Sequence, residues 1–306
     1  MVVFAGAAGG PSMAAPPTTA QVWMKAEMDA VPDLIPETMM GTTIHPTAYV
    51  DRHAELGAGV SIGPFCTVGP HVTIGDGATL VSHVVVEGHT TIGEAVTLFP
   101  FCTVGLQPQD FKYKGEPTRC EIGARTHIRE HCSIHRGTVT GRGTTSVGSD
   151  CLIMAVAHVA HDCVLGNNVI VANNAVMGGH VRIGDHAVIG GAAAIHQFVR
   201  IGRAAMIGGV SGVEGDVIPF GSVIGNRAHL AGLNVVGLKR RGFDKTQILR
   251  LHTAFRALYR QGGVFADRLA ETRSRFGGDP LVAEVLAFID AESHRGLLRA
   301  SPSNSR

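Results

Sequence analysis

The 306-residue sequence contains 40 glycines and only 5% aromatic residues, a composition that argues against an ordinary β-sandwich or a doubly wound core. Lys and Arg number 26 and Asp and Glu number 25, so the net charge of +1 gives no electrostatic footprint for nucleic acid. The six cysteines form no CxxC pair, which argues against both a disulfide scaffold and a thiolate zinc site. No long uninterrupted apolar stretch and no secretory signal are present, so we expect a cytoplasmic protein with no integral membrane contact.

The N-terminal residues 1–43 are rich in Ala, Pro, Gly, Thr and Met and have no sustained period. Such a segment cannot bury enough apolar surface to offset its conformational entropy, so we predict a disordered extension. Met40 is a possible alternative start.

A period of six residues dominates the chain from residue 44 onward. Branched apolar residues occupy eleven consecutive positions of this period, from Ile44 to Val104, and the period later continues as far as Val213. The slot four residues later holds small or apolar residues, among them five of the six cysteines, which we therefore interpret as buried hydrophobes. The period matches a hexapeptide β-helix, in which three units close one triangular coil of about 18 residues. We predict such a prism over residues 44–225.

Two insertions interrupt the period, near residues 105–121 and 140–146. The first is polar and contains two prolines, so it must project from the prism as a loop. Long loops on a rigid scaffold often carry function.

A helical pattern replaces the six-residue period toward the C-terminus. Apolar residues from Ile248 to Tyr259 follow helical spacing after Asp244, a plausible N-cap, and a second apolar stripe runs from Leu281 to Ile289. We predict a small helical domain over residues 226–300, followed by a tail at 301–306.

The length of one coil predicts that three histidines lie on one edge of the prism. The intervals between His161, His180 and His196 are 19 and 16 residues, so they fall within two positions of the same edge on successive coils. Strand spacing predicts ring separations on the order of 5–10 Å. We therefore expect these histidines to line one groove.

The histidines of this groove have three interpretations. They could act as a general base, ligate a metal, or merely pack well. A general base needs an acceptor on its second nitrogen, which could be Asp162 or a backbone carbonyl, although adjacent strand residues point opposite ways. Zinc binding of the γ-carbonic anhydrase type is disfavoured, because Asn173, Asn174 and Gly179 supply no further ligands. We expect no metal.

Several motifs closely resemble the UDP-N-acetylglucosamine 3-O-acyltransferases of lipid A biosynthesis. They are, in chain order, IGPFCTVGPHVTIG, QDFKYKGEPTR, IREHCSIHRGT, AHVAHDCVLGNN, IHQF, GVSGV and GLKRRGF. The likeness spans about residues 44–298 and implies that the β-helix is left-handed. It also implies transfer of a 3-hydroxyacyl group from acyl carrier protein to the 3-hydroxyl of UDP-N-acetylglucosamine, without a cofactor beyond the carrier's phosphopantetheine, by a homotrimer with sites between subunits.

The resemblance also implies roles for individual residues. His161 is the expected general base, with Asp162 beside it, and the backbone N–H of Gly179 is the expected oxyanion donor. Gly209 is expected to cap the acyl groove and, by leaving space, to favour a longer chain. Further substrate contacts are expected at Asp110, Lys112, His135, His158, His180, His196, Gln197, Asn234, Arg240 and Arg241. The family has an acidic nucleotide contact in some members where this chain has Val236.

A patch for acidic acyl carrier protein is expected from the cations of the C-terminal region. Its members are Lys239, Arg240, Arg241, Arg250, Arg256 and Arg260. The alternatives are the N-acyltransferase that acts later in the same pathway, the γ-carbonic-anhydrase-type zinc enzyme and a non-catalytic hexapeptide scaffold. Relatives of the N-acyltransferase carry an N-terminal uridine-binding domain, for which about 43 biased residues leave no room.

Overall fold

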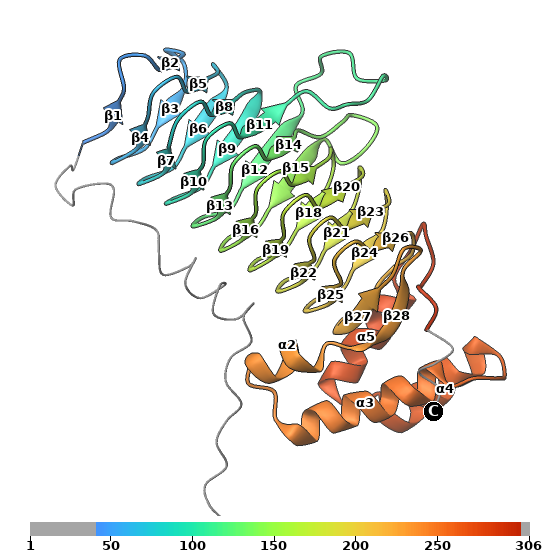
Figure 1. Cartoon of the computed structure of the whole chain (residues 1–306). Coiled ribbons are helices and arrows are strands. Elements are labelled where there is room, and N and C mark those ends of the chain that lie inside the picture. Colours follow the sequence, from blue (N-terminus) through green and yellow to red (C-terminus); the bar gives the residue numbers. More distant parts are fainter. Residues whose placement is uncertain (1–40, 301–306) are drawn as a thin grey trace, which may run out of the picture. The chain divides into compact units, whose positions relative to one another are not determined.

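The computed structural model describes residues 41–300, and the predicted extension and tail lie almost wholly outside this range. The described chain is a left-handed parallel β-helix followed by a small helical region, as predicted (Figure 1). No helix among the described residues is both long enough and apolar enough to cross a membrane.

Three sheets form the walls of the prism, and successive strands visit them in turn. The first sheet contains β1 (Thr43–Ile44), β4 (Ser61–Ile62), β7 (Thr79–Leu80), β10 (Thr97–Leu98), β13 (His127–Ile128), β16 (Leu152–Ile153), β19 (Ile170–Val171), β22 (Val188–Ile189), β25 (Met206–Ile207), β27 (Gly221–Ile224) and β28 (His229–Leu233). The second contains β2 (Tyr49–Val50), β5 (Thr67–Val68), β8 (Val85–Val86), β11 (Thr103–Leu106), β14 (Ser133–His135), β17 (His158–Val159), β20 (Val176–Met177), β23 (Ala194–Ile195) and β26 (Gly212–Val213). The third contains β3 (Glu55–Leu56), β6 (Val72–Ile74), β9 (His89–Ile92), β12 (Arg119–Ile122), β15 (Thr144–Val147), β18 (Val164–Leu165), β21 (Arg182–Ile183) and β24 (Arg200–Ile201).

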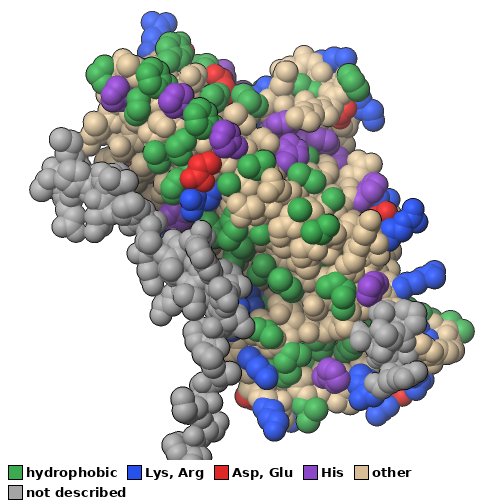
Figure 2. All heavy atoms as spheres, in the orientation of Figure 1, with side chains coloured by type: hydrophobic (Ala, Val, Ile, Leu, Met, Phe, Trp, Pro, Cys, Tyr) green, Lys and Arg blue, Asp and Glu red, His purple; other side chains and the backbone are tan. Residues whose placement is uncertain are grey.

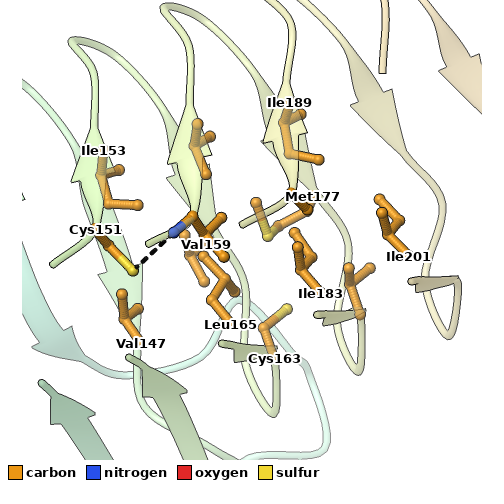
Figure 3. Packing of buried hydrophobic residues seen from close by; sticks show 14 of the residues in the cluster. Val147, Cys151, Ile153, Val159, Cys163, Leu165, Met177, Ile183, Ile189 and Ile201 are labelled. Atoms are coloured by element: carbon orange, nitrogen blue, oxygen red, sulfur yellow. Dashed lines mark hydrogen bonds between the residues drawn. The ribbon is translucent and has the colours of Figure 1, made fainter. Parts of the chain in front are cut away.

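The branched residues of the period point into the prism and form its core (Figure 3). Ile153, Val159 and Leu165 come from three different walls and are at most 2% exposed. Each stacks on an equivalent residue of the next coil, because paired strands are offset by one coil, as in Val159↔Met177. All six cysteines are buried free thiols, which confirms the interpretation of the five in the periodic slot as small hydrophobes.

The corners between walls use the left-handed backbone region at residues other than glycine. Asp162, His180 and Phe198 have φ values of 60°, 63° and 67° and lie one above another at the corner between the second and third walls. Short polar side chains tolerate this region better than most residues do. The corner backbone therefore sets the direction of these three side chains, which form one column along the prism.

The boundaries of the two loops differ from those that the sequence indicated. They span residues 107–118 and 136–143 rather than 105–121 and 140–146. β12 and β15 extend to four residues each and pair along their full length, from Arg119↔Thr144 to Ile122↔Val147, which draws the flanking residues into the third wall. Both loops project from the prism (Figure 1).

The segment predicted as helical from residue 226 begins with a strand. β28 turns back to pair antiparallel with β27, which closes the end of the first wall. The helices follow as α2 (Val235–Arg240), α3 (Lys245–Tyr259), α4 (Phe265–Phe276) and α5 (Pro280–Asp290). Asp244 caps α3 through a capping box, as expected. α4 was not foreseen, because its apolar residues Phe265, Leu269 and Phe276 are few and only partly buried.

Candidate functional site

The centre of the site is the pair His161 and Asp162, at the corner that follows β17. The Nδ1 atom of His161 lies 2.9 Å from Oδ2 of Asp162. The objection that neighbouring residues point apart does not hold, because Asp162 has a φ of 60° and belongs to the corner, not to a strand. The carboxylate can therefore hold the imidazole with Nδ1 protonated, which leaves Nε2 as the basic nitrogen.

The second insertion loop holds this carboxylate in place. Asp162 is fully buried and accepts hydrogen bonds from the backbone N–H groups of Thr138 and Gly143, each at 3.1 Å, and from Oγ1 of Thr138 at 2.6 Å. Burial alone would raise the pKa of Asp162, but the hydrogen bonds from His161 and Thr138 hold it below its usual range. Asp162 is thus a fixed anion.

Two glycines let the backbone approach the imidazoles closely. A Cβ atom at Gly179 would lie 2.5 Å from Cε1 of His161, and one at Gly141 would lie 2.4 Å from the Asp162 carboxylate and 2.6 Å from His180. Within residues 41–300 the N–H of Gly179 donates to no other group. It is therefore an available donor beside the His161 ring.

Four imidazoles gather here, and we call His135, His158, His161 and His180 the histidine cluster. The rings of His161 and His180 are 5.1 Å apart, and those of His135 and His158 are 5.0 Å apart. Oγ of Ser133 lies 2.7 Å from Nδ1 of His158. Histidine side chains gather beside the projecting loops on this face of the molecule (Figure 2).

Burial keeps most of the cluster uncharged at neutral pH. It lowers the pKa of His135 to about 4, with further contributions from His158 and His161. Burial likewise lowers the pKa of His158 and of His180, although Asp162 opposes the shift at His180. His135, His158 and His180 therefore surround His161 with neutral imidazoles.

Acidification should destabilise the fold through His135. Its pKa is lower in the folded chain, at about 4, than in the unfolded chain, at about 6.5, so the unfolded state binds more protons between these values and stability falls as the pH drops through this window. Replacing His135 by Asn should reduce this pH-dependent loss by roughly 1–3 kcal/mol. Melting curves of both proteins between pH 7.5 and 4 measure the difference, and parallel curves would contradict the assignment.

The first insertion loop is anchored beside the cluster. Arg136 donates from Nε and Nη2 to the hydroxyl of Tyr113, at 2.9 and 2.7 Å, and from Nη1 to the carbonyl of Gly105. Asp110 caps the turn by accepting from the N–H of Lys112, and its charge acts on the pKa of His180. Asp110, one of the two loop residues singled out from the sequence, therefore lies near the cluster.

His196 lies within two positions of the column of rings, as its interval indicated, but its own ring is not part of the column. Stacking follows an 18-residue interval, so the column that begins at Asp162 passes through His180 to Phe198, whose ring lies 4.4 Å from that of His180. His196 lies two residues earlier, beside Gln197 and Arg295.

The remaining predicted contacts lie on other edges of the prism. Asn234 caps α2 and donates to the carbonyl of Ala204, while Arg241 donates to the carbonyl of His186. Ala204 and His186 are corner residues between the third and first walls. Gly209 lies in the turn between β25 and β26, that is, between the first and second walls, and Arg240 and Val236 are exposed on α2. Within the described chain these residues make no contact with the histidine cluster.

His161, Asp162 and His180 could in principle ligate a metal ion, since their ligand atoms lie within 4.8 Å of one another. The carboxylate is already committed, however, to Thr138, Gly143 and His161. This donor set is better suited to orienting an imidazole than to coordinating an ion.

Sequence reasoning missed several residues of the site. Phe198 could have been found, since it lies one coil after His180. Thr138 and Gly143 could not, because the loop that carries them interrupts the period. The same holds for His294, whose ring lies 5.2 Å from that of Phe198 although it follows the last helix.

Family models match both parts of the chain. Residues 216–298 match domain 2 of the UDP N-acetylglucosamine O-acyltransferases, and residues 53–88 and 144–179 match the bacterial transferase hexapeptide repeat.

Similar proteins are found among both curated sequences and solved structures. An acyl-[acyl-carrier-protein]–UDP-N-acetylglucosamine O-acyltransferase of Brucella anthropi is 48% identical over 257 residues, which cover 84% of this chain and 92% of the relative. The structure of LpxA from Acinetobacter baumannii is 43% identical with a TM-score of 0.81 and covers 84% of this chain and 99% of its own. The UDP-N-acetylglucosamine acyltransferase of Arabidopsis is 36% identical with a TM-score of 0.75 and covers 84% of this chain and 100% of its own.

Proposed function

The chain belongs to the family of acyl-[acyl-carrier-protein]–UDP-N-acetylglucosamine O-acyltransferases and transfers an acyl group from acyl carrier protein to UDP-N-acetylglucosamine in lipid A biosynthesis, and we propose that His161 is the general base of this reaction. The observation that carries the proposal is the 2.9 Å contact between Nδ1 of His161 and the buried Asp162 carboxylate. The later N-acyltransferase and the zinc hydrase find no support among the relatives.

Nε2 of His161 takes the proton from the 3-hydroxyl of the sugar as its oxygen attacks the thioester carbonyl. A sugar hydroxyl is a poor nucleophile at neutral pH, and removing its proton in the transition state contributes typically 10²- to 10⁴-fold to the rate. The Asp162 anion stabilises the imidazolium that forms. The C–S bond then breaks, and the thiol of the carrier's pantetheine leaves with a proton.

The oxyanion of the tetrahedral intermediate is stabilised by the backbone N–H of Gly179. This donor has no partner within the described chain and lies on a backbone in close contact with the His161 ring. A preorganised donor of this kind acts most strongly where charge develops in the transition state. Base and oxyanion donor are thus held side by side by two stacked coils.

The neighbouring residues position the substrates. His135, His158 and His180 present neutral rings around His161, and Asp110 and Lys112 approach from the first loop. His196 and Gln197 extend the surface by one coil. Arg240 and Arg241 suit the nucleotide phosphates, since a guanidinium binds phosphate through paired hydrogen bonds. Asn234 is proposed as a third nucleotide contact. It is the N-cap residue of α2 and so orders the first turn of that helix.

We propose that the active form is a homotrimer in the cytoplasm, without a metal. His161 and the nucleotide residues lie at different edges of one prism, so a second copy is needed to bring them together. Gly209, at a third edge, would then cap the acyl groove from a neighbouring subunit. Six free thiols suit a reducing compartment. The cations Lys239, Arg250, Arg256 and Arg260, with the two nucleotide arginines, would attract the acidic carrier protein.

The proposed substrates are tested by supplying a panel of 3-hydroxyacyl carrier proteins of different chain lengths with UDP-N-acetylglucosamine. We expect a single ester product at the 3-hydroxyl, with a long acyl chain preferred because Gly209 leaves the groove open. Mass spectrometry identifies the product and its acyl length. An amide product from an amino-sugar analogue alone, or no ester at all, would contradict the proposal.

A further inference from the structure

The segment that follows α5 returns to the prism and is fixed there by a buried carboxylate. Asp216 is 1% exposed and accepts from Oγ of Ser293 at 2.6 Å and from Nε of Arg200 at 2.7 Å. Its backbone N–H donates to the carbonyl of Gly296 at 2.7 Å, and Leu298 donates back to its carbonyl. Residues 293–298 are therefore held by both side-chain and backbone bonds.

This anchoring brings two basic side chains to the end of the histidine cluster. The ring of His294 packs on Phe198, which in turn stacks on His180. Arg295, the next residue, contacts Nδ1 of His196 through Nη2. The segment thus lies at one end of the histidine cluster, although it is more than a hundred residues from His161 in the sequence.

Arg295 has no counter-ion in the part of the chain that the structure describes. The nearest buried carboxylate, Asp216, is already paired with Arg200 and Ser293. Nε of Arg295 is enclosed and finds no hydrogen-bond partner among residues 41–300. An uncompensated guanidinium at the end of the histidine cluster is a site for an anion.

We propose that Arg295 binds a phosphate group of a substrate at this end of the histidine cluster. Both substrates carry phosphate, so the chemistry is shared between the phosphopantetheine arm and the nucleotide. The column from His161 through His180 and Phe198 to His294 extends over three ring-to-ring steps, on the order of 15 Å. That distance favours the phosphate at the far end of the pantetheine arm over the phosphate attached directly to the sugar. The inference rests on the proposed function, since it places the thioester at His161.

The test compares two thioester donors that differ only in this phosphate, 3-hydroxyacyl phosphopantetheine and 3-hydroxyacyl pantetheine. The wild-type chain should prefer the phosphorylated donor in kcat/KM, and Arg295→Ala should reduce that preference by roughly 10- to 100-fold. Arg295→Lys should retain part of it, because the charge remains without the planar fork. Arg299→Ala is the matched control, because it also removes one arginine charge, four residues further along the chain. The Arg299 side chain has no contact with the site, so this substitution should leave the preference for the phosphorylated donor unchanged.

The ratio of the two donors is insensitive to a partial loss of folded protein, which lowers both rates equally. A raised KM for UDP-N-acetylglucosamine with an unchanged donor ratio would keep Arg295 as a phosphate ligand but assign it to the nucleotide. An unchanged ratio and an unchanged KM for the nucleotide would overturn the proposal and leave Arg295 with a structural role only. Because that result requires an active wild-type enzyme, it is distinct from failure of the acyltransferase function.

Discussion

Replacing His161 by alanine is expected to lower kcat by roughly 10²- to 10⁴-fold or more. The substitution removes the group that accepts the hydroxyl proton, while the Gly179 N–H and the binding surface remain. His161 lies at a corner and outside the buried apolar core, so the melting temperature and the mass of the assembly should hardly change. The measurement is turnover of 3-hydroxyacyl carrier protein with UDP-N-acetylglucosamine, with melting curves recorded in the same buffer.

His53→Ala is the matched control, since His53 is also paired with an aspartate, at 2.9 Å, but on an exposed corner near the start of the prism. It should retain full activity. Near-normal turnover of His161→Ala would remove the mechanism proposed here, and a loss of activity accompanied by loss of the folded assembly would require the more conservative His161→Gln.

Replacing Asp162 by asparagine should affect both activity and stability. An amide cannot accept from Thr138, Gly143 and His161 together, and one of its ends becomes a donor facing other donors. The loss of a buried charge from such a network costs about 3–5 kcal/mol of unfolding free energy. The wrong tautomer of His161 should in addition lower kcat by at least about 100-fold.

Measuring kcat well below the melting temperature separates these two effects. Asp150→Asn is the control, because Asp150 also lies at a corner but its ion pair with Arg125 is exposed and such pairs contribute little. An Asp162→Asn variant that melts at a lower temperature but turns over normally would show that the carboxylate only supports the fold of the second loop.

The six-residue period was sufficient to predict the β-helix, its inward-facing residues and the approach of His161 to His180. The reason is that a closed coil of constant length turns sequence separation directly into position along the axis. The intervals of 19 and 16 residues placed His196 within two positions of this edge, and the strict 18-residue interval leads to Phe198. The burial of five of the six cysteines followed from the slot assigned to them in the period.

Family motifs, rather than the period, indicated the chemistry of the site. Asp110, Lys112 and Gly179 carry no periodic signal of function, and they were singled out through the resemblance alone. The structure adds the physical reason for Gly179, because any side chain there would overlap the His161 ring.

Only the tertiary structure decided how the base is oriented and which residues lie at the end of the histidine cluster. The contact between His161 and Asp162 depends on the left-handed corner backbone, and the burial of Asp162 depends on a loop that breaks the period. Arg295 reaches the site because Asp216 captures a segment from beyond the last helix. Local sequence patterns encode contacts at constant spacing, but contacts made by insertions and by a returning terminus have no fixed spacing, so folding alone determines them.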